Sequence, residues 1–105
     1  MGLFVYGELC KPAVLLAVLG RVPPAEPALL NGFRKVINVS TGYFHAVPHD
    51  NEVIVGLLLD GIEDAELEVL DDFENVEGGE YGRVRVEVET SDSGRRESAW
   101  AYVAA

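Results

Sequence analysis

The first twelve residues, Met1 to Pro12, place a strand, a tight turn and the start of a helix in immediate succession. An apolar run from Leu3 to Tyr6 is interrupted by Gly7, which lets the backbone turn sharply or approach a ligand closely. Pro12 suits the first position of a helix, where the missing N–H has no partner in any case. Free N–H groups in such a turn, backed by a helix N-terminus, attract anions. The segment therefore predicts a backbone cradle for a carboxylate near residue 7.

The length and charge of the chain limit what kind of protein it can be. Its 105 residues predict one domain spanning residues 1–105, with one core and room for a modest pocket. Eighteen acids against eight bases give a net charge of −10, which disfavours nucleic acid and anionic membrane surfaces as partners. No apolar run is long enough to cross a bilayer. We expect a soluble, cytoplasmic protein, and the sequence leaves its oligomeric state open.

One cysteine and two histidines limit the redox and metal chemistry. Cys10 has no partner for an internal disulfide, which fits a reducing compartment. A lone cysteine beside a turn is more often a small buried apolar residue than a nucleophile. His45 and His49 form no cluster with Cys10 that has the spacing of a metal site, so we expect none.

Apolar periodicity and chain-breaking residues predict the elements of the first half. Pro12 to Leu19 reads as a nearly all-apolar, buried helix that ends at Gly20. Arg21 to Pro27, with three prolines, is expected to be an irregular connection. Ala28 to Val39 follows as a strand in which Gly32 permits a bulge. The rest is expected to be a short strand, a turn and an apolar strand buried on both faces, at Tyr43–Val47, Pro48–Asn51 and Glu52–Leu59.

The second half predicts one more helix and a hairpin. The helix spans roughly Asp64 to Glu74, and Glu77 to Gly82 follows as a loop. Strict alternation from Arg83 to Thr90 predicts a half-buried strand, with Arg83 on its polar face in a structural or solvent-facing position. Glu97 to Val103 returns as the hairpin partner. The chain as a whole predicts an α+β fold: a small mixed β-barrel of about five or six strands with two short flanking helices.

The predicted Asp64–Glu74 helix carries two carboxylates inside its apolar arc. The arc contains Ala65, Leu67, Val69, Leu70 and Phe73, whereas the opposite, solvated side contains Asp64, Glu68, Asp71 and Asp72. Glu66 lies in the first turn, where an acid favours the helix dipole and reaches water. Glu74 lies at the other end, where the dipole disfavours a negative charge. Glu74 is either a helix-end residue at the solvent margin or a buried carboxylate with a raised pKa, suited to acid–base catalysis near neutral pH.

Several short motifs, each different from the others, are spread along nearly the whole chain, from Leu3 to Val103. They are Phe4-Val5-Tyr6-Gly7-Glu8-Leu9 followed by Pro12, Asn31-Gly32-Phe33-Arg34, Val55-Gly56, Leu70-Asp71-Asp72-Phe73-Glu74 and Tyr81-Gly82-Arg83. In this order and spacing they resemble the γ-glutamylcyclotransferase-like family, also called the AIG2-like family. The ordered set is more specific than any single motif. The resemblance implies a small β-barrel with flanking helices and a cavity at its mouth.

The same resemblance implies a set of site residues. Glu74 matches the family's catalytic glutamate, and the backbone from Gly7 to Leu9 matches its substrate-binding turn. Tyr81 is expected to donate a hydrogen bond in the pocket. Tyr6 is expected either to contact the ligand or to pack in the core.

The implied substrate is a small molecule with a γ-glutamyl or similar acyl-amide group. Its α-amine attacks the γ-carbonyl carbon, closes a five-membered ring, and leaves 5-oxoproline and a free amine. Glu74 would take the ammonium proton and return one to the leaving amine. The N–H groups of the Gly7–Leu9 turn would hold the substrate's carboxylate or the developing oxyanion. This chemistry requires no metal or organic cofactor.

The chain departs from the family pattern at two positions. Glu8 stands where the family usually has Ser or Thr, and a carboxylate is unfavourable beside an anion site. Either its side chain points away while its N–H still serves, or the pocket prefers a cationic or neutral group. His45 stands where members often have proline, and we expect it to be a surface or packing histidine near a turn.

Two other classes of function stay open from the sequence. One is a non-catalytic small-molecule-binding domain that keeps the barrel and the cavity, a possibility that Glu8 favours. The other is an acidic protein-interaction module, because the stretch from Asp60 to Glu80 holds ten acids and no base.

Overall fold

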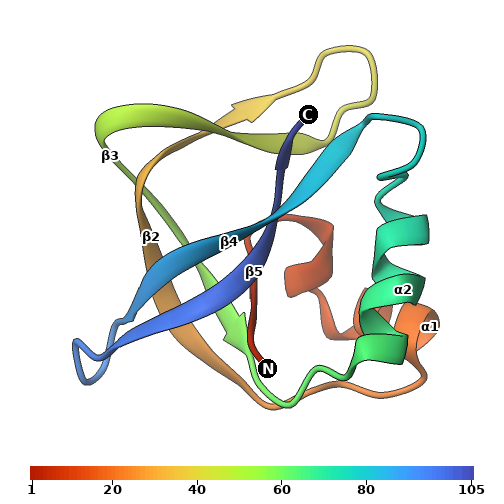
Figure 1. Cartoon of the computed structure of the whole chain (residues 1–105), viewed down its shortest axis with the longest axis horizontal. Helices are drawn as coiled ribbons and strands as arrows, with labels where there is room; N and C mark the ends of the chain where they lie inside the picture. The colour runs from red at the N-terminus through yellow and green to blue at the C-terminus, as the bar shows by residue number, and fades with distance from the viewer.

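The computed structural model describes all of residues 1–105 and shows a closed, five-stranded mixed barrel. In chain order the elements are β1 (Leu3–Val5), one turn of 3₁₀ helix (Glu8–Cys10), α1 (Pro12–Leu19), β2 (Ala25–Ile37), β3 (Phe44–Leu59), α2 (Asp64–Phe73), β4 (Tyr81–Thr90) and β5 (Arg96–Ala104). The strand order is β1–β3–β2–β4–β5, in which β1 and β5 are parallel and the other neighbours antiparallel (Figure 1). The predicted fold class is confirmed. No helix is long and apolar enough to span a membrane.

The three residues of β1 are buried on both faces because this strand lies between two cores. Successive side chains of a strand point to opposite faces. Leu3 and Val5 therefore join the core between the barrel and the helices, whereas Phe4 joins the core inside the barrel. The backbone of β3 approaches β1 closely at Gly56, where an added Cβ would lie 2.2 Å from the carbonyl oxygen of Val5. β1 leads directly into the Gly7 turn, so this packing also places the turn.

The two helices lie together on one side of the barrel (Figure 1). The predicted bounds of α1 and its end at Gly20 are confirmed, since Gly20 adopts a left-handed conformation with φ 77°. The prediction that α1 is buried all round is wrong: only Leu15 is fully buried, and Leu16 is 56% exposed. The barrel and α2 cover one side of α1, and its other side faces solvent.

α2 buries a narrower arc than the sequence predicted. Leu67 and Leu70 are buried, whereas Val69 and Phe73 are each almost half exposed. Glu66 does not simply reach water: it completes a capping box with Glu63 and forms an ion pair with Arg21. The first turn of α2 is thereby fixed by the capping box and by the ion pair with Arg21, which follows α1.

The predicted turn at residues 48–51 is not a chain reversal but a bulge within one continuous strand, β3. Phe33 pairs with Pro48 and Asn31 pairs with Val53, so four residues of β3 stand opposite Gly32. Positive φ angles at Gly32 and Asn51, 82° and 65°, allow the irregularity. The bulge predicted at Gly32 is thus confirmed. The turn residues mark a break in regular pairing and not the end of a strand, because β2 pairs with β3 on both sides of the break.

Three other strand predictions need correction. Ala25 to Pro27 belong to β2 and not to an irregular connection, because they pair with Leu59 to Leu57 of β3. Tyr81 and Gly82 are not in a loop but begin β4, paired with Ala104 and Val103. The segment Glu52–Leu59 is buried on both faces only at its end, since Val55 is 68% exposed.

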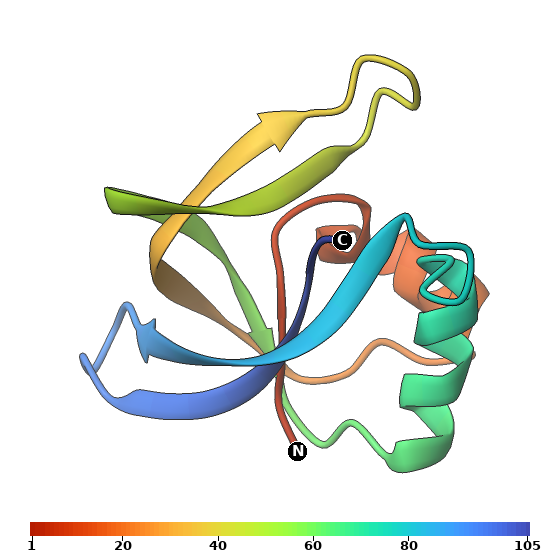
Figure 2. The ribbon, with the colours of Figure 1, turned by 45° about the horizontal axis from the view of Figure 1, so that its top comes forward.

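The β2–β3 hairpin forms an arm that rises away from β4 and β5 (Figure 2). β2 pairs with β4 only at Ala28 and Leu29, and beyond this point it pairs only with β3. The arm carries Tyr43 and Phe44 to the end of the barrel where β1 turns into the 3₁₀ helix. The arm therefore forms one wall of the space described below.

Candidate functional site

A cavity of about 370 Å³ opens at this end of the barrel. Its walls come from the turn after β1, the arm, the end of α2, the start of β4 and the end of β5. The lining residues are Phe4, Val5, Tyr6, Gly7, Glu8, Leu9, Lys11, Gly42, Tyr43, Phe44, Phe73, Glu74, Glu80, Tyr81 and Tyr102. All six residues that the sequence singled out for the site therefore line one cavity: Tyr6, Gly7, Glu8, Leu9, Glu74 and Tyr81.

Glu74 is the first residue after α2 and lies half-buried in this cavity. Its N–H donates to the carbonyl of Leu70 at 2.8 Å, so the last turn of α2 sets its position. It stands four residues after Leu70 and seven after Leu67, on the helix face that packs against the barrel. Burial, and secondarily the negative charge of Glu80, raises the pKa of Glu74 to about 7. A carboxyl with this pKa can both accept and donate a proton near neutral pH.

The turn after β1, residues Gly7 to Leu9, lines the same cavity. The N–H of Gly7 donates to no group of the protein, and the first N–H groups of a helix have no partner within it. The turn is held by hydrogen bonds from Cys10 to the Gly7 carbonyl and from Lys11 to the Glu8 carbonyl, each 3.0 Å. Leu9 is buried in the core and anchors the turn to the barrel. The turn predicted as an anion cradle is thus held by backbone hydrogen bonds and lines the cavity that holds Glu74.

Glu8 forms an ion pair with Lys11, with 3.0 Å between the carboxylate and the ammonium nitrogen. Both residues line the cavity, the Lys11 side chain is largely exposed and that of Glu8 partly exposed, and the pair offsets the negative charge that Glu8 brings to the turn. An exposed pair of this kind is weak and can be opened by a competing ion. The Glu8 carboxylate therefore does not by itself exclude an anion from the N–H groups of the turn.

The hydroxyl groups of Tyr6 and Tyr81 tie the arm to the body of the barrel. The Tyr6 hydroxyl donates to the carbonyl of Tyr102 and accepts from the N–H of Ala46 at 3.0 Å. The Tyr81 hydroxyl donates to the carbonyl of Phe44 at 2.7 Å. Burial, followed by the charge of Glu74, raises the pKa of Tyr81 to about 12, and burial likewise raises the pKa of Tyr6. The Tyr81 hydroxyl hydrogen expected to meet a ligand is therefore already donated to the arm, and both tyrosines line the cavity.

Replacing Tyr6 with phenylalanine is expected to lower the free energy of unfolding by about 2 kcal/mol, because a part-buried N–H and a carbonyl lose their partner. Urea denaturation measures the change. Tyr43→Phe is the matched control, since Tyr43 is exposed and its hydroxyl makes no hydrogen bond to the protein, and it should change stability by less than about 0.5 kcal/mol. Equal stability of the two variants would contradict the bridging role of Tyr6.

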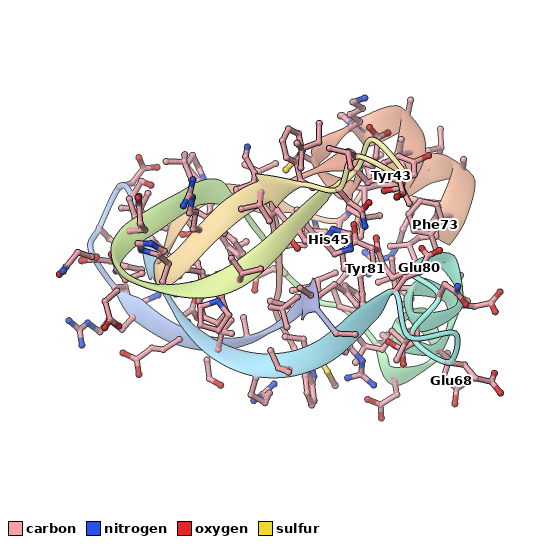
Figure 3. The ribbon with its side chains drawn as sticks, turned by 90° about the horizontal axis from the view of Figure 1, so that it is seen from above. Tyr43, His45, Glu68, Phe73, Glu80 and Tyr81 are labelled. Atoms are coloured by element: carbon pink, nitrogen blue, oxygen red, sulfur yellow. The ribbon has the colours of Figure 1, made fainter.

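Sequence reasoning missed the aromatic residues of the rim. Phe73 was assigned to the buried arc of its helix, yet it is half-exposed and lines the cavity together with Tyr43 and Phe44 of the arm. Figure 3 shows Tyr43, Phe73, Glu80 and Tyr81 gathered at the same end of the barrel. No local pattern could have assembled these four residues, because they come from the arm, α2, the loop before β4 and the start of β4.

His45 is a packing histidine, as expected, but it is buried and not at the surface. Its ring stacks on that of Tyr81, with 4.3 Å between the centroids and an interplanar angle of 17°. It lies behind Tyr81 and does not line the cavity. His45 therefore supports a wall of the site from outside.

Comparison with known proteins identifies related sequences. The sequence model of the family described as "Gamma-glutamyl cyclotransferase, AIG2-like" matches residues 3–105. The chain is 39% identical to AIG2-like protein C of Arabidopsis thaliana over 101 residues, which cover 96% of this chain and 57% of that protein. It is 32% identical over 100 residues to a protein of Methanocaldococcus jannaschii named gamma-glutamylcyclotransferase and putative RNase, covering 95% of this chain and 44% of that protein.

The fold has a close counterpart among solved structures. A structure titled gamma-glutamyl cyclotransferase superposes with a TM-score of 0.84 at 18% identity, covering all of this chain and 66% of the other. At this identity the likeness shows the fold. The chain spans about half the length of the curated relatives that it matches.

Proposed function

The chain belongs to the AIG2-like gamma-glutamyl cyclotransferase family, and on that premise we propose that it is a γ-glutamyl-amide cyclotransferase of the γ-glutamylamine type. It would convert a γ-glutamyl amide into 5-oxoproline and a free amine. One observation carries the proposal: a carboxyl whose pKa is raised to about 7, Glu74, shares a cavity with the free N–H group of Gly7. The cavity's volume of about 370 Å³ suits a small substrate.

The proton transfers assigned to Glu74 follow from the chemistry of the substrate. The α-amine of a γ-glutamyl amide is protonated at neutral pH and must lose one proton before it can attack. Glu74 takes this proton, and the amine nitrogen then forms a bond to the γ-carbonyl carbon. After the attack the ring nitrogen still carries one proton too many, and it releases this proton to water as the tetrahedral intermediate collapses. The bond from that carbon to the amide nitrogen breaks, and Glu74 returns the first proton to the leaving amine. The carboxyl ends in its starting state, and no oxidant, reductant or cofactor enters the balance.

The turn after β1 supplies the second part of the proposed mechanism. Its N–H groups would hold the substrate's α-carboxylate or the oxyanion of the intermediate, as fixed donors that need no rearrangement during the reaction. Binding at two points, the turn and Glu74, would keep the glutamyl chain bent so that its amine lies near its own γ-carbonyl. The aromatic rim formed by Tyr43, Phe44 and Phe73 would then contact the amine that leaves.

A second candidate is a binding domain with the same cavity and no turnover, which the carboxylate of Glu8 favours. The ion pair with Lys11 weakens this argument, because it offsets the charge of Glu8. The name of the Methanocaldococcus jannaschii relative supports the catalytic reading for that protein, and the proposal extends it to this chain.

Incubation with a panel of γ-glutamyl amines and γ-glutamyl dipeptides tests the proposal, with 5-oxoproline release as the readout. Release from at least one γ-glutamyl amine is the expected result. A ligand-induced rise in melting temperature without any release of 5-oxoproline would instead support the binding domain.

Glu80→Gln is expected to move the pH dependence of turnover to lower pH. A general base works when it is deprotonated, so kcat/KM should rise with pH through the pKa of Glu74, about 7. Removing the negative charge of Glu80 lowers this pKa by a fraction of a unit, since burial is the larger cause of the shift. The pH–rate profile at low salt measures the change. Glu77→Gln, in the same loop, is the control, and an equal shift in both variants would contradict a specific effect of Glu80.

A further inference from the structure

A polar contact outside the cavity joins the last turn of α2 to two strands of the barrel. The Oδ1 of Asp71 accepts a hydrogen bond from the Nε of Arg83 at 2.7 Å, and its Oδ2 accepts from Nη2 at 3.2 Å. The same Oδ1 accepts from the hydroxyl of Tyr102 at 2.7 Å. Asp71 was expected on the solvated side of the helix, and it is instead half-buried against β4 and β5.

The two donors are held in place independently of Asp71. Arg83 and Tyr102 are directly paired residues of β4 and β5. The guanidinium carbon of Arg83 lies 4.3 Å from the centroid of the Trp100 ring, also on β5. The Tyr102 carbonyl accepts from the Tyr6 hydroxyl, and Tyr102 also lines the cavity. The barrel therefore presents a preformed fork into which the Asp71 carboxylate fits.

Asp71 stands three residues before Glu74 and is held through both its side chain and its backbone carbonyl. Its side chain reaches the barrel, and its carbonyl accepts a hydrogen bond from Val76 at 3.0 Å. The segment that carries Glu74 is thus closed into a loop between Asp71 and Val76. Any movement of Asp71 away from Arg83 would be passed to Glu74 through less than one turn of helix.

We infer that Asp71 is a positioning residue: its ion pair with Arg83 and its hydrogen bond from Tyr102 hold Glu74 in the cavity. The catalytic consequence rests on the proposed function, whereas the placement of Glu74 does not. A general base must lie within hydrogen-bond reach of the proton that it takes, and a misplacement of 1 Å can cost about 10²-fold in rate.

The chain offers a matched control at the other end of the same helix. Glu66 forms a two-point ion pair with Arg21, at 2.8 and 2.7 Å, and it also caps the first turn. Glu66→Gln therefore weakens α2 through the same kind of contact, far from Glu74. Glu68, which is exposed and points away from the barrel, serves as a second control for the loss of one charge from α2 (Figure 3).

The Arg83→Gln variant separates the effect of the lost charge from the effect of a displaced Glu74, because the two move the pKa of Glu74 in opposite directions. The titratable groups that affect Glu74 or are affected by it are Glu80, Tyr6, Tyr81 and Tyr102, with the Asp71–Arg83 pair beside Tyr102. Arg83→Gln removes a positive charge and leaves Asp71 unpaired, which by charge alone raises the pKa of Glu74. If the last turn of α2 instead loosens and Glu74 meets water, its pKa falls.

The test follows the side-chain carboxyl carbon of Glu74 by NMR titration, together with kcat and KM for 5-oxoproline release. In Asp71→Asn and Arg83→Gln, the pKa of Glu74 is expected to fall from about 7 toward its ordinary 4.5. We expect kcat to fall about tenfold or more with KM within about threefold, since the loss is one of alignment. Glu66→Gln and Glu68→Gln should leave the pKa and kcat unchanged. Arg83→Lys, which keeps the charge and loses the fork, should give intermediate values.

Each contrary outcome overturns the inference. A rise in the pKa of Glu74 in Arg83→Gln would make the contact purely electrostatic. Equal changes in the pKa of Glu74 and in kcat for Asp71→Asn and Glu66→Gln would show an effect of general helix stability only. An unchanged pKa of Glu74 in Asp71→Asn would show that Asp71 has no positioning role. Should Asp71→Asn fail to fold, Arg83→Gln and Arg83→Lys decide the same question. If the unaltered protein releases no 5-oxoproline, the proposed function fails, while the titration still decides the positioning role.

Discussion

Glu74→Gln is expected to lower kcat for 5-oxoproline release by about 10²–10⁴-fold, the contribution of a positioned general acid–base group. Glutamine keeps the size of the side chain and cannot take the proton from the substrate's ammonium group. The ground-state contacts of the substrate with the turn after β1 stay in place, so KM should change by less than about threefold. Steady-state kinetics with the best γ-glutamyl amine of the panel measures both parameters.

Asp72→Asn is the control for this variant, because Asp72 is an exposed acid two residues earlier on the same helix. It should keep the full rate. Folding of Glu74→Gln is not at risk, since the neutral amide replaces a carboxyl whose charged form is disfavoured by burial. Retention of more than about a tenth of kcat in Glu74→Gln would contradict the role of Glu74 as general base.

Gly56→Ala is expected to lower the free energy of unfolding by about 3 kcal/mol, the upper part of the range for overpacking. The added Cβ would meet the Val5 carbonyl oxygen at 2.2 Å and the Phe4 ring at 2.8 Å. A backbone oxygen cannot rotate away, so β1 would have to move from β3 as a whole. For a domain of this size the loss corresponds to a fall in melting temperature of roughly 15 °C.

Gly82→Ala is the matched control, a strand glycine whose added Cβ meets nothing within 4 Å. It should leave stability unchanged or raise it slightly, since alanine reduces the entropy of the unfolded chain. Thermal unfolding of the two variants measures the difference. Equal melting temperatures would contradict the close approach of β1 and β3 that holds the turn after β1.

Local patterns in the sequence were enough to predict two of the elements that build the site. The turn at Gly7 and the helix that ends at Glu74 are each encoded within about ten residues, by a glycine, a proline and an apolar period. The barrel was predicted from the number of strands and their mixture with helices. The family resemblance linked Glu74 to the turn, two segments that no local pattern connects.

The errors concern features that depend on long-range pairing. Asp71 and Asp72 look alike in sequence, and only the packing of Leu67 and Leu70 decides which of them meets Arg83. Turn residues interrupt β3, but β2 pairs with it before and after the bulge and keeps the strand continuous. Phe73 was assigned to the core by its helical period, although the barrel covers too little of α2 to bury it.

The central claim is that the Gly7–Leu9 turn and Glu74 bind one substrate in one cavity. The most direct test is a titration of the ¹⁵N-labelled Glu74→Gln variant with an intact γ-glutamyl amine, observed through backbone amide signals. The account predicts saturable shifts of the Gly7, Glu8 and Leu9 amide signals, together with that of residue 74, with a single dissociation constant. Saturable shifts confined to residues outside the cavity, or no shift at the turn while the wild-type protein turns the same compound over, would contradict it.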